Sequence, residues 1–285
     1  MCRKYGWSAA GVWCKLGPMK SPPPVRALQI TDLHIVPDVG ASIYGTDSFE
    51  SLRAVLRAAL SLPAPPELIV ATGDLSEDGS EESYHRLRGA LLEAELPVHV
   101  LPGNHDSVSR MKSSLVGGLI QMGPVVDVEP WRIVLLDSRV RGKPHGFLES
   151  SQLDILSSAL GDDPSRPVLA CLHHGPARPC PTPGCALQND AALLDLLGSR
   201  PNARAVISGH AHAEIERRFE HVTLLTTPST CSQGVHAQLG EPVDHEDFWA
   251  SHRFDPSRYG FRMLTLLPGG EIESQVHWVP STPVA

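Results

Sequence analysis

The sequence lacks the features that mark several large classes of protein. None of its apolar runs approaches the ~18–20 residues that a membrane-spanning helix requires, so we expect no membrane span. Aromatic residues make up only 5% of the 285 residues, and the formal net charge is −8. Proteins that bind a nucleic-acid polymer present basic surface and, for single strands, aromatic side chains that stack on the bases. The composition therefore argues against a nucleic-acid polymer as the partner.

The six cysteines form neither a CxxC pair nor a zinc-finger spacing. A chain of 285 residues can bury a large core without disulfides, so we expect a reducing, cytoplasmic location. Cys180 and Cys185 flank a proline-rich loop. The sequence leaves open whether these two residues form a small bridge.

Residues 1–24 are predicted to form a disordered tail. The stretch from Trp7 to Leu16 is interrupted by Ser, Gly and Lys, so it lacks the apolar segment of a signal peptide. An upstream translation start, with Met19 as the native first residue, explains the same segment equally simply. No repeat or low-complexity linker divides the chain after Val25, and we predict one folded domain over residues 25–285.

Short apolar strands alternate with helical patterns from Val25 onward. The order of strand, polar loop and helix favours an α/β fold in which helices cover the faces of a mixed sheet. In open sheets of this kind, ligands bind beyond the carboxyl ends of the strands. Strands are predicted at 25–30, 67–72, 97–102, 167–174, 203–212, 222–227, 260–267 and 272–279, a hairpin at 125–138, and helices at 47–60, 81–95, 150–160 and 189–197.

Polar residues follow five of these strands. Taken singly, each group has a structural explanation, such as a carboxylate that caps a turn. A histidine pair after an apolar strand is less ordinary, because buried imidazoles need partners or a metal. Five such groups at strand ends together indicate a metal site. They are Asp32-Leu33-His34, Gly73-Asp74, Gly103-Asn104-His105-Asp106, His173-His174 and Gly209-His210-Ala211-His212.

The order of these groups resembles the calcineurin-like metallophosphoesterase superfamily, and within it the bacterial class III cyclic nucleotide phosphodiesterases. The resemblance covers about residues 25–267 and rests on TDLH, GDLSEDGSEESYHRLR, LPGNHD, CLHHGP, SGHAH and YGFRMLTL. It implies a four-layer α/β/β/α sandwich with mixed sheets. It also implies two metal ions per chain, held by Asp32, His34, Asp74, Asn104, His173, His210 and His212.

On this resemblance, the two metals share Asp74 as a bridging ligand. Asp32, His34 and His212 complete the first set, and Asn104, His173 and His210 complete the second. Carboxylate and imidazole ligands without cysteine suit Mn, Fe, Zn or Co and do not fix which of these is bound. Such a pair lowers the pKa of bound water toward ~7 and supplies hydroxide for in-line attack on a phosphodiester.

His105 is predicted to be catalytic. It resembles the histidine that contacts the phosphoryl group and assists the departure of the leaving oxygen, which is the work of a general acid. Asn104, His105 and His212 are also the candidates for substrate binding.

Neighbouring polar residues have structural alternatives. Asp106 either orients the catalytic histidine or braces its loop, and Asp78 either caps the next helix or supports a ligand. Asp137 is expected in a turn or beside a ligand. His174 is expected to face a neighbour while the histidine before it binds metal. Asn189 is expected to cap a helix rather than to contact substrate.

The sequence therefore predicts a metal-dependent phosphodiesterase that acts on 3′,5′-cyclic nucleotides such as cAMP. The alternative is a broader enzyme acting on glycerophosphodiesters, 2′,3′-cyclic nucleotides or other small diesters. A non-catalytic scaffold with this fold is the third hypothesis, and the complete ligand set argues against it. The expected partner is a small phosphodiester molecule. The C-terminal strands either cap a sheet edge or pair with a second subunit in a homodimer.

Overall fold

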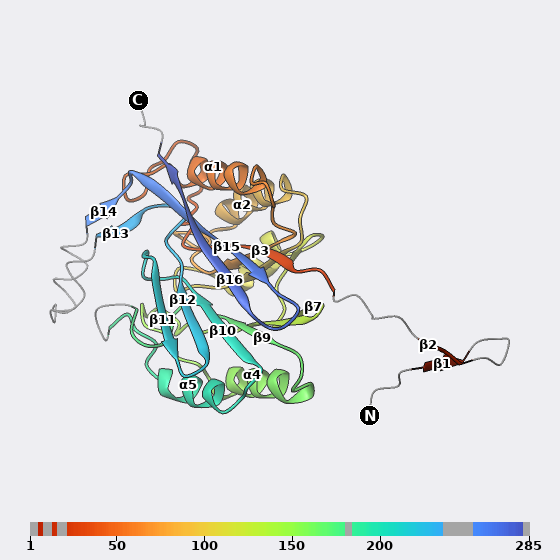
Figure 1. The fold of residues 1–285 in the computed structure, drawn as a ribbon. Helices are drawn as coiled ribbons and strands as arrows, with labels where there is room; N and C mark the ends of the chain where they lie inside the picture. Colours follow the sequence, from red (N-terminus) through yellow and green to blue (C-terminus); the bar gives the residue numbers. More distant parts are fainter. Residues whose placement is uncertain (1–4, 8–12, 16–21, 180–183, 236–252, 282–285) are drawn as a thin grey trace.

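The computed structural model describes residues 5–7, 13–15, 22–179, 184–235 and 253–281. Two six-stranded sheets lie face to face at its centre. Helices cover the outer face of each sheet, so four layers follow one another in the order α, β, β, α (Figure 1). The expected fold class, a four-layer α/β/β/α sandwich with mixed sheets, is confirmed.

The first sheet is built from β3 (Val25–Ile30), β4 (Leu68–Thr72), β5 (Val98–Leu101), β6 (Ile120–Gln121), β15 (Arg258–Leu266) and β16 (Ile272–Pro280). Its strand order is β16-β15-β3-β4-β5-β6. The strands from β3 to β6 run parallel, whereas β15 is antiparallel to both of its neighbours. The crossover helices α1 (Ser48–Leu60) and α2 (Glu81–Leu92) pack on its outer face.

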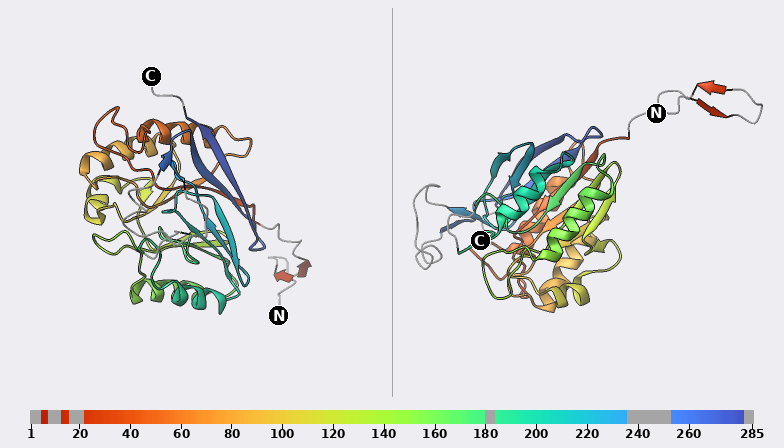
Figure 2. Two further views of the ribbon diagram at one scale, coloured as in Figure 1. Left: turned by 90° about the vertical axis from the view of Figure 1, so that its left-hand side faces the viewer. Right: turned by 90° about the horizontal axis from the view of Figure 1, so that it is seen from below.

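The second sheet is built from β7 (Val125–Val128), β8 (Trp131–Leu135), β9 (Val168–Cys171), β10 (Ala203–Ser208), β11 (Ile215–Phe219) and β12 (Val222–Thr226). Its order is β11-β12-β10-β9-β8-β7, with antiparallel pairs at both edges and parallel pairs between them. Helices α4 (Ser150–Asp162) and α5 (Asp190–Gly198) cover its outer face. Figure 2 shows these two helices on the side opposite to α1 and α2.

Short elements complete the described chain. β1 (Tyr5–Trp7) pairs with β2 (Trp13–Lys15), within the segment expected to be a disordered tail. The division into residues 1–24 and 25–285 stays a prediction. The one-turn α3 (Val108–Arg110) and the π-helical η1 (Met111–Leu115) follow β5, and β13 (Gln233–Val235) pairs with β14 (Arg253–Asp255).

Strand β3 is mostly apolar because both faces of its sheet are covered by other layers. Leu28 and Ile30 pack with α1 and α2, while Ala27 points the other way into the core between the sheets. Gln29 also faces inward, and its amide is fully used. Its Nε2 donates to Thr72 Oγ1 and to Ser208 O, each at 3.0 Å, so it ties the two sheets together.

Trp131 anchors the core between the sheets. Its side chain is fully buried, and its indole Nε1 donates to Leu267 O at 2.8 Å, just beyond the end of β15. Leu169 and Ile207 of the same sheet meet Leu264 of the opposite sheet in this core. The apolar layer therefore fixes how the two sheets lie against each other.

The predicted strands and helices after Val25 all have counterparts. Their ends differ slightly; for example, the first helix begins at Ser48 because Asp47 is its N-cap and accepts from the backbone nitrogens of Phe49 and Glu50. β11 was not predicted, since its sequence IERRF is mostly charged, as suits an exposed edge strand.

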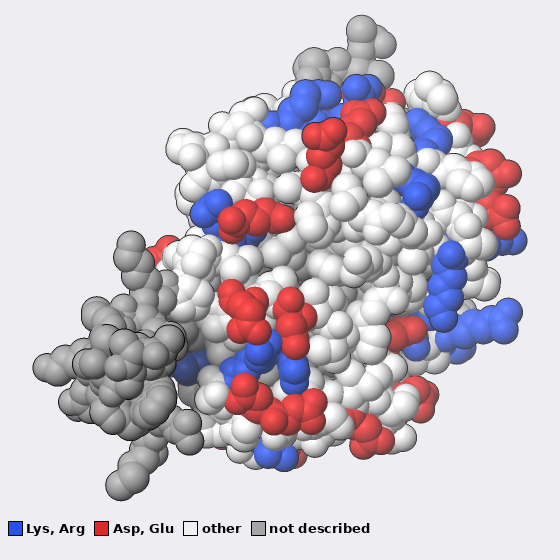
Figure 3. Space-filling model, turned by 90° about the vertical axis from the view of Figure 1, so that its right-hand side faces the viewer, with Lys and Arg blue, Asp and Glu red and all other residues white. Residues whose placement is uncertain are grey.

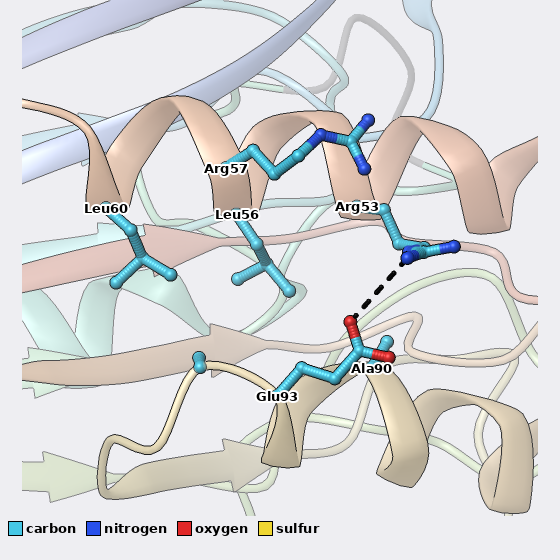
Figure 4. Close-up of a pocket in the computed structure, with 7 residues that line it drawn as sticks. Arg53, Leu56, Arg57, Leu60, Ala90 and Glu93 are labelled. Carbon is cyan, nitrogen blue, oxygen red and sulfur yellow. Dashed lines mark ion pairs between the residues drawn. The ribbon is translucent and has the colours of Figure 1, made fainter.

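Acidic and basic side chains are interspersed on the face drawn in Figure 3, so this face carries no large patch of charge of one sign. A small groove lies between α1 and α2, lined by Leu56 and Leu60 and bordered by an ion pair of 3.9 Å between Arg53 and Glu93 (Figure 4). Among the described residues, no helix is long and apolar enough to cross a membrane. Pairing with a second copy stays a prediction.

Trp131→Ala is expected to lower the free energy of unfolding by about 3–5 kcal/mol, because it opens a cavity between the sheets. Val125→Ala on the neighbouring strand is the control. That side chain is 39% exposed, so the change should be within about 0.5 kcal/mol. Urea denaturation followed by circular dichroism measures both variants. Equal losses in the two would contradict the central position given to Trp131.

Candidate metal centre

The predicted site residues come from both sheets and meet where the carboxyl ends of five parallel strands converge. The loops after β3, β4 and β5 belong to the first sheet, and the loops after β9 and β10 belong to the second. These loops carry Asp32 and His34, Asp74, Asn104 and His105, His173, and His210 and His212, respectively.

Hydrogen bonds join these loops across the gap between the sheets. The backbone nitrogen of His210 donates to both carboxylate oxygens of Asp32, at 3.0 and 3.1 Å. Within the second sheet, the backbone nitrogen of Gly209 donates to His173 O at 3.1 Å. Within the first, the backbone nitrogen of His105 donates to Asp74 Oδ1 at 2.9 Å. The loops therefore hold one another in place through main-chain groups.

Three members of the first predicted ligand set form one cluster. His34 Nε2 and His212 Nε2 are 3.2 Å apart, and Asp32 Oδ1 is 3.4 Å from His212 Nε2. The ligand atoms of these three buried residues all lie within 4.8 Å of one another. Two imidazole nitrogens and a carboxylate oxygen thus face a common point, which is the donor set that first-row metals prefer.

The second predicted set lies beside the first and touches it. His173 Nε2 is 3.1 Å from Asp74 Oδ2 and 3.9 Å from Asp32 Oδ1. Asn104 Oδ1, His173 Nε2 and His210 Nε2 are buried and make no hydrogen bond within the described structure. Buried polar atoms are rarely left without a partner. Three such atoms, all of metal-ligating types, fit a cation at this position.

The histidines are oriented by hydrogen bonds from their other ring nitrogens. His173 Nδ1 lies 2.9 Å from Thr72 O, and His212 Nδ1 lies 2.8 Å from Ser232 O. A carbonyl can only accept, so each Nδ1 carries a hydrogen and each Nε2 is left to face the site. Metal-ligating histidines are commonly held in this way.

Glu77 is a functional candidate that the sequence did not reveal. Its Oε2 lies 2.6 Å from His34 Nδ1 and 3.5 Å from His105 Nδ1, and its backbone oxygen lies 3.0 Å from the same His105 nitrogen. One residue therefore positions a predicted ligand and the predicted acid. Its place in GDLSEDG, three residues after Asp74, was the available signal, but the loop conformation that turns it inward was not readable.

The backbone is strained at the site. Asp32, His34, Asp74, His210 and His212 all have positive φ, between 47° and 69°. A side chain other than glycine rarely adopts this region, and each instance costs about 1–3 kcal/mol unless its surroundings impose it. Such residues cluster at functional sites, which agrees with the position of the five here.

Glycines in the same loops leave room for the ligands. A Cβ atom at Gly103 would overlap the backbone nitrogen and the carboxylate of Asp74, and one at Gly209 would overlap the Thr31 hydroxyl and the Asp32 carboxylate. Gly73 lies against the His173 ring. The glycines that precede the ligands in the motifs are thus required by close packing.

Burial and the neighbouring charges decide the protonation states. Burial tends to raise the pKa of Asp32, but the His212 imidazole outweighs it and brings the pKa to about 2. Burial also opposes ionisation of Asp74, yet His173 holds its pKa well below the usual range. Burial lowers the pKa of His210 to about 3, assisted by the charge of His173. The two carboxylates are therefore ionised and His210 is neutral. Burial opposes protonation of His173 and His212, but Asp74 raises the pKa of His173 to about 9 and Asp32 raises that of His212, so an entering metal ion would displace protons from these two rings.

His105 lies at the edge of the cluster and is the most exposed of its histidines, with 30% of its side chain accessible. Burial lowers its pKa, but the carboxylates of Asp74 and Glu77 outweigh this and raise it above the ordinary value. The protonated form is therefore favoured, and a protonated histidine facing solvent can donate a proton.

His174 is buried beside the cluster but its ring is occupied. Ser138 Oγ lies 2.8 Å from its Nδ1, and its Nε2 lies 3.2 Å from Pro144 O. Burial holds its pKa well below the usual range, so the ring is neutral. With Nε2 donating to a carbonyl and Nδ1 accepting from a hydroxyl, neither nitrogen is available to a metal.

The remaining polar residues have structural contacts. Asp106 accepts from the backbone nitrogens of Gly103, Leu75 and Ser76 and from the Tyr84 hydroxyl, so it braces two loops. Asp78 accepts from Ser80 and Ser83 at the start of α2, and Asp137 binds Arg139 within a turn.

The expectation for Asn189 needs correction. It occupies the N-cap position of α5 but makes no capping hydrogen bond, because its side chain pairs with the backbone of Leu148. Cys185 is disulfide-bonded, and Cys180 lies outside the described residues.

Comparison with known proteins gives a consistent result. The pattern of the family described as calcineurin-like phosphoesterase matches residues 25–214. The chain is 35% identical over 265 residues to the 3′,5′-cyclic adenosine monophosphate phosphodiesterase CpdA of Escherichia coli, covering 90% of this chain and 91% of that protein. It is 31% identical over 265 residues to a 3′,5′-cyclic-nucleotide phosphodiesterase of Nostoc, covering 90% and 93%.

Solved structures resemble the fold at much lower sequence identity. A dimetal phosphatase from Danio rerio aligns with a TM-score of 0.59 at 17% identity, covering 89% of this chain and 99% of that one. The purple acid phosphatase PPD1 of yellow lupin aligns with a TM-score of 0.60 at 12% identity, covering 94% and 55%. At such identities the likeness concerns the fold alone.

Gly103→Ala is expected to displace Asp74 and to lower metal affinity about tenfold or more, as changes next to ligands commonly do. Gly89→Ala is the matched control, because a Cβ there meets no atom within 4 Å and removal of a mid-helix glycine adds roughly 0.5–1 kcal/mol of stability. Metal titration followed by thermal unfolding tests both. Unchanged metal affinity in the Gly103 variant would contradict the close packing.

Proposed function

The chain belongs to the calcineurin-like phosphoesterase family and is a metal-dependent phosphodiesterase, and we propose that it hydrolyses 3′,5′-cyclic nucleotides, with cAMP preferred. The observation that carries the reaction class is the convergence of seven ligand-type side chains from both sheets on one buried cluster. The substrate preference is supported by relatives that are named as cyclic nucleotide phosphodiesterases and that align over nearly the whole chain.

The proposed site would hold two metal ions, with Asp74 available as a ligand to both. Asp32, His34 and His212 are assigned to the first ion on the strength of their mutual distances. The second ion is assigned to the three residues whose buried donor atoms make no hydrogen bond within the described structure, namely Asn104, His173 and His210. The donor set is composed of oxygen and nitrogen, which suits Mn, Fe, Zn or Co.

Bound divalent ions would supply a hydroxide at neutral pH and would offset the charge that develops on the phosphoryl group. The chain's own residues do the rest. Asp32 and Asp74 remain ionised and present negatively charged oxygens to entering cations. The backbone carbonyls of Thr72 and Ser232 keep the His173 and His212 rings aimed at the centre.

His105 is the proposed general acid. Its Nδ1 is fixed between the backbone oxygen and the carboxylate of Glu77, so its Nε2 is left to face the substrate. Its raised pKa favours the protonated form that can protonate the leaving 3′-oxygen. Together with Asn104 and His212 it is also proposed to contact the substrate.

Metal analysis of the purified protein should find close to two ions per chain, and chelation should abolish turnover. Turnover of cAMP, 2′,3′-cAMP and bis(p-nitrophenyl) phosphate with Mn²⁺ then ranks the substrates. We expect the highest kcat/KM for cAMP. Turnover of the model diester alone would refute the substrate while leaving the metal site standing. A metal-free protein without metal-dependent activity would refute both.

His105→Ala should lower kcat by about 10²–10⁴, because a positioned general acid contributes that much, while metal content stays near that of the wild type. Asn104→Ala should instead weaken the second metal. His85→Ala, an exposed histidine on α2, is the control and should change neither quantity. Loss of both metals in the His105 variant would contradict the separation of these roles.

A further inference from the structure

An aromatic pair borders the first ligand cluster. The rings of Tyr44 and Phe254 stack, with centroids 3.9 Å apart and planes at 29°. Tyr44 meets His34 edge to face at 5.4 Å, and Phe254 lies 5.6 Å from the His212 ring. Both aromatic side chains are partly exposed. They therefore form one wall next to two proposed metal ligands.

A tight turn presents Tyr44. The backbones of Ile43 and Thr46 exchange two hydrogen bonds of 2.9 Å, and the two residues between them have φ values of 53° and 80°. Two consecutive positive φ angles define a type I′ turn, whose first central residue is usually Asn, Asp or Gly. Tyrosine there is strained, and strain of this kind is characteristic of functional positions.

Phe254, the other residue of the pair, is connected to the metal site through backbone hydrogen bonds. Phe254 of β14 pairs with Gly234 of β13, whose backbone nitrogen donates to His212 O at 3.0 Å. A Cβ at Gly45 would lie 3.3 Å from Pro256, so the turn also packs on the segment that carries Phe254. The wall is thus held at a fixed position relative to a proposed ligand.

The Tyr44 side chain is partly exposed, and its hydroxyl makes no hydrogen bond to the described residues. A tyrosine hydroxyl is protonated at neutral pH, so it can act as a hydrogen-bond donor.

We propose that the Tyr44–Phe254 pair is the subsite for the nucleobase of the substrate, with the Tyr44 ring as its main contact surface and the Tyr44 hydroxyl as a donor to the nucleoside. This inference rests on the proposed function. A substrate whose phosphorus lies between the two ligand sets extends its nucleoside beyond one of them, and the aromatic wall stands beside His34 and His212. An aromatic surface suits any purine or pyrimidine, because each has a flat π-face.

The wall also agrees with the composition of the chain. The chain has 6 Phe and 4 Tyr residues, and one of each forms the stacked pair beside the proposed metal ligands. One pair is enough for one base and does not make the multi-base platform of a polymer-binding protein.

The test compares the binding of 5′-AMP and ribose 5-phosphate to the Mn²⁺-loaded protein by calorimetry. These ligands differ only by the base, so the ratio of their Kd values reports the base contact without requiring turnover. We expect AMP to bind about tenfold more tightly in the wild type, within the range known for base–aromatic contacts. Tyr44→Leu should bring the ratio to within about threefold of one, with ribose 5-phosphate affinity and metal content unchanged.

Tyr44→Phe keeps the ring and removes only the hydroxyl, and it should retain most of the AMP preference. Equal binding of the two ligands by the wild type would overturn the proposal. So would an equal loss for both ligands in Tyr44→Leu, or a loss in Tyr44→Phe as complete as in Tyr44→Leu. A protein that prefers AMP but does not hydrolyse cAMP would contradict the proposed function and support the subsite. A protein that hydrolyses cAMP without preferring AMP would support the proposed function and contradict the subsite.

Discussion

Asp32 and Asp74 carry negative charge where water does not reach, at the junction of the two sheets. An isolated buried carboxylate would protonate, because the free energy of removing its charge from water is large. Here the charge is retained because His212 and His173 lie beside it and because backbone N–H groups of His210 and His105 donate to it. The positions of the loops follow from this requirement, since each must bring a donor or an imidazole to one of the two carboxylates.

That requirement explains the unusual conformations around the cluster. Ligand residues with positive φ are turned inward at a strain that the neighbouring hydrogen bonds and packing impose. Gly103 and Gly209 stand where any side chain would displace a carboxylate. Asp106 joins the loops after β4 and β5 through their backbone nitrogens. The loops are therefore held in position by the protein's own hydrogen bonds and packing, as in a preorganised catalytic centre.

The sequence was most informative where chemistry and periodicity act locally. The apolar residues of Val25–Ile30 are enough to predict a strand. The types and spacing of the histidines and carboxylates in the motifs are enough to indicate metal ligands. Features that depend on distant parts of the chain were not readable. The inward turn of Glu77, the pairing of Asn189 with Leu148 and the stacking of Tyr44 on Phe254 each join segments far apart in sequence. The charged strand β11 was missed because its place at a sheet edge, not its own residues, makes it a strand.

The ligands come from both halves of the sandwich, and this has a consequence for the molecule as a whole. Cations bound by Asp32 and His212 together would act as a clamp between the sheet that carries the first and the sheet that carries the second. Metal occupancy and the relative placement of the two sheets are then thermodynamically linked. A change that favours the native placement of the sheets favours metal binding by the same free energy, and the reverse also holds. A protein that loses its ions thus loses contacts that join the two sheets as well as its catalytic activity. Its free energy of unfolding then depends on the metal concentration in its surroundings.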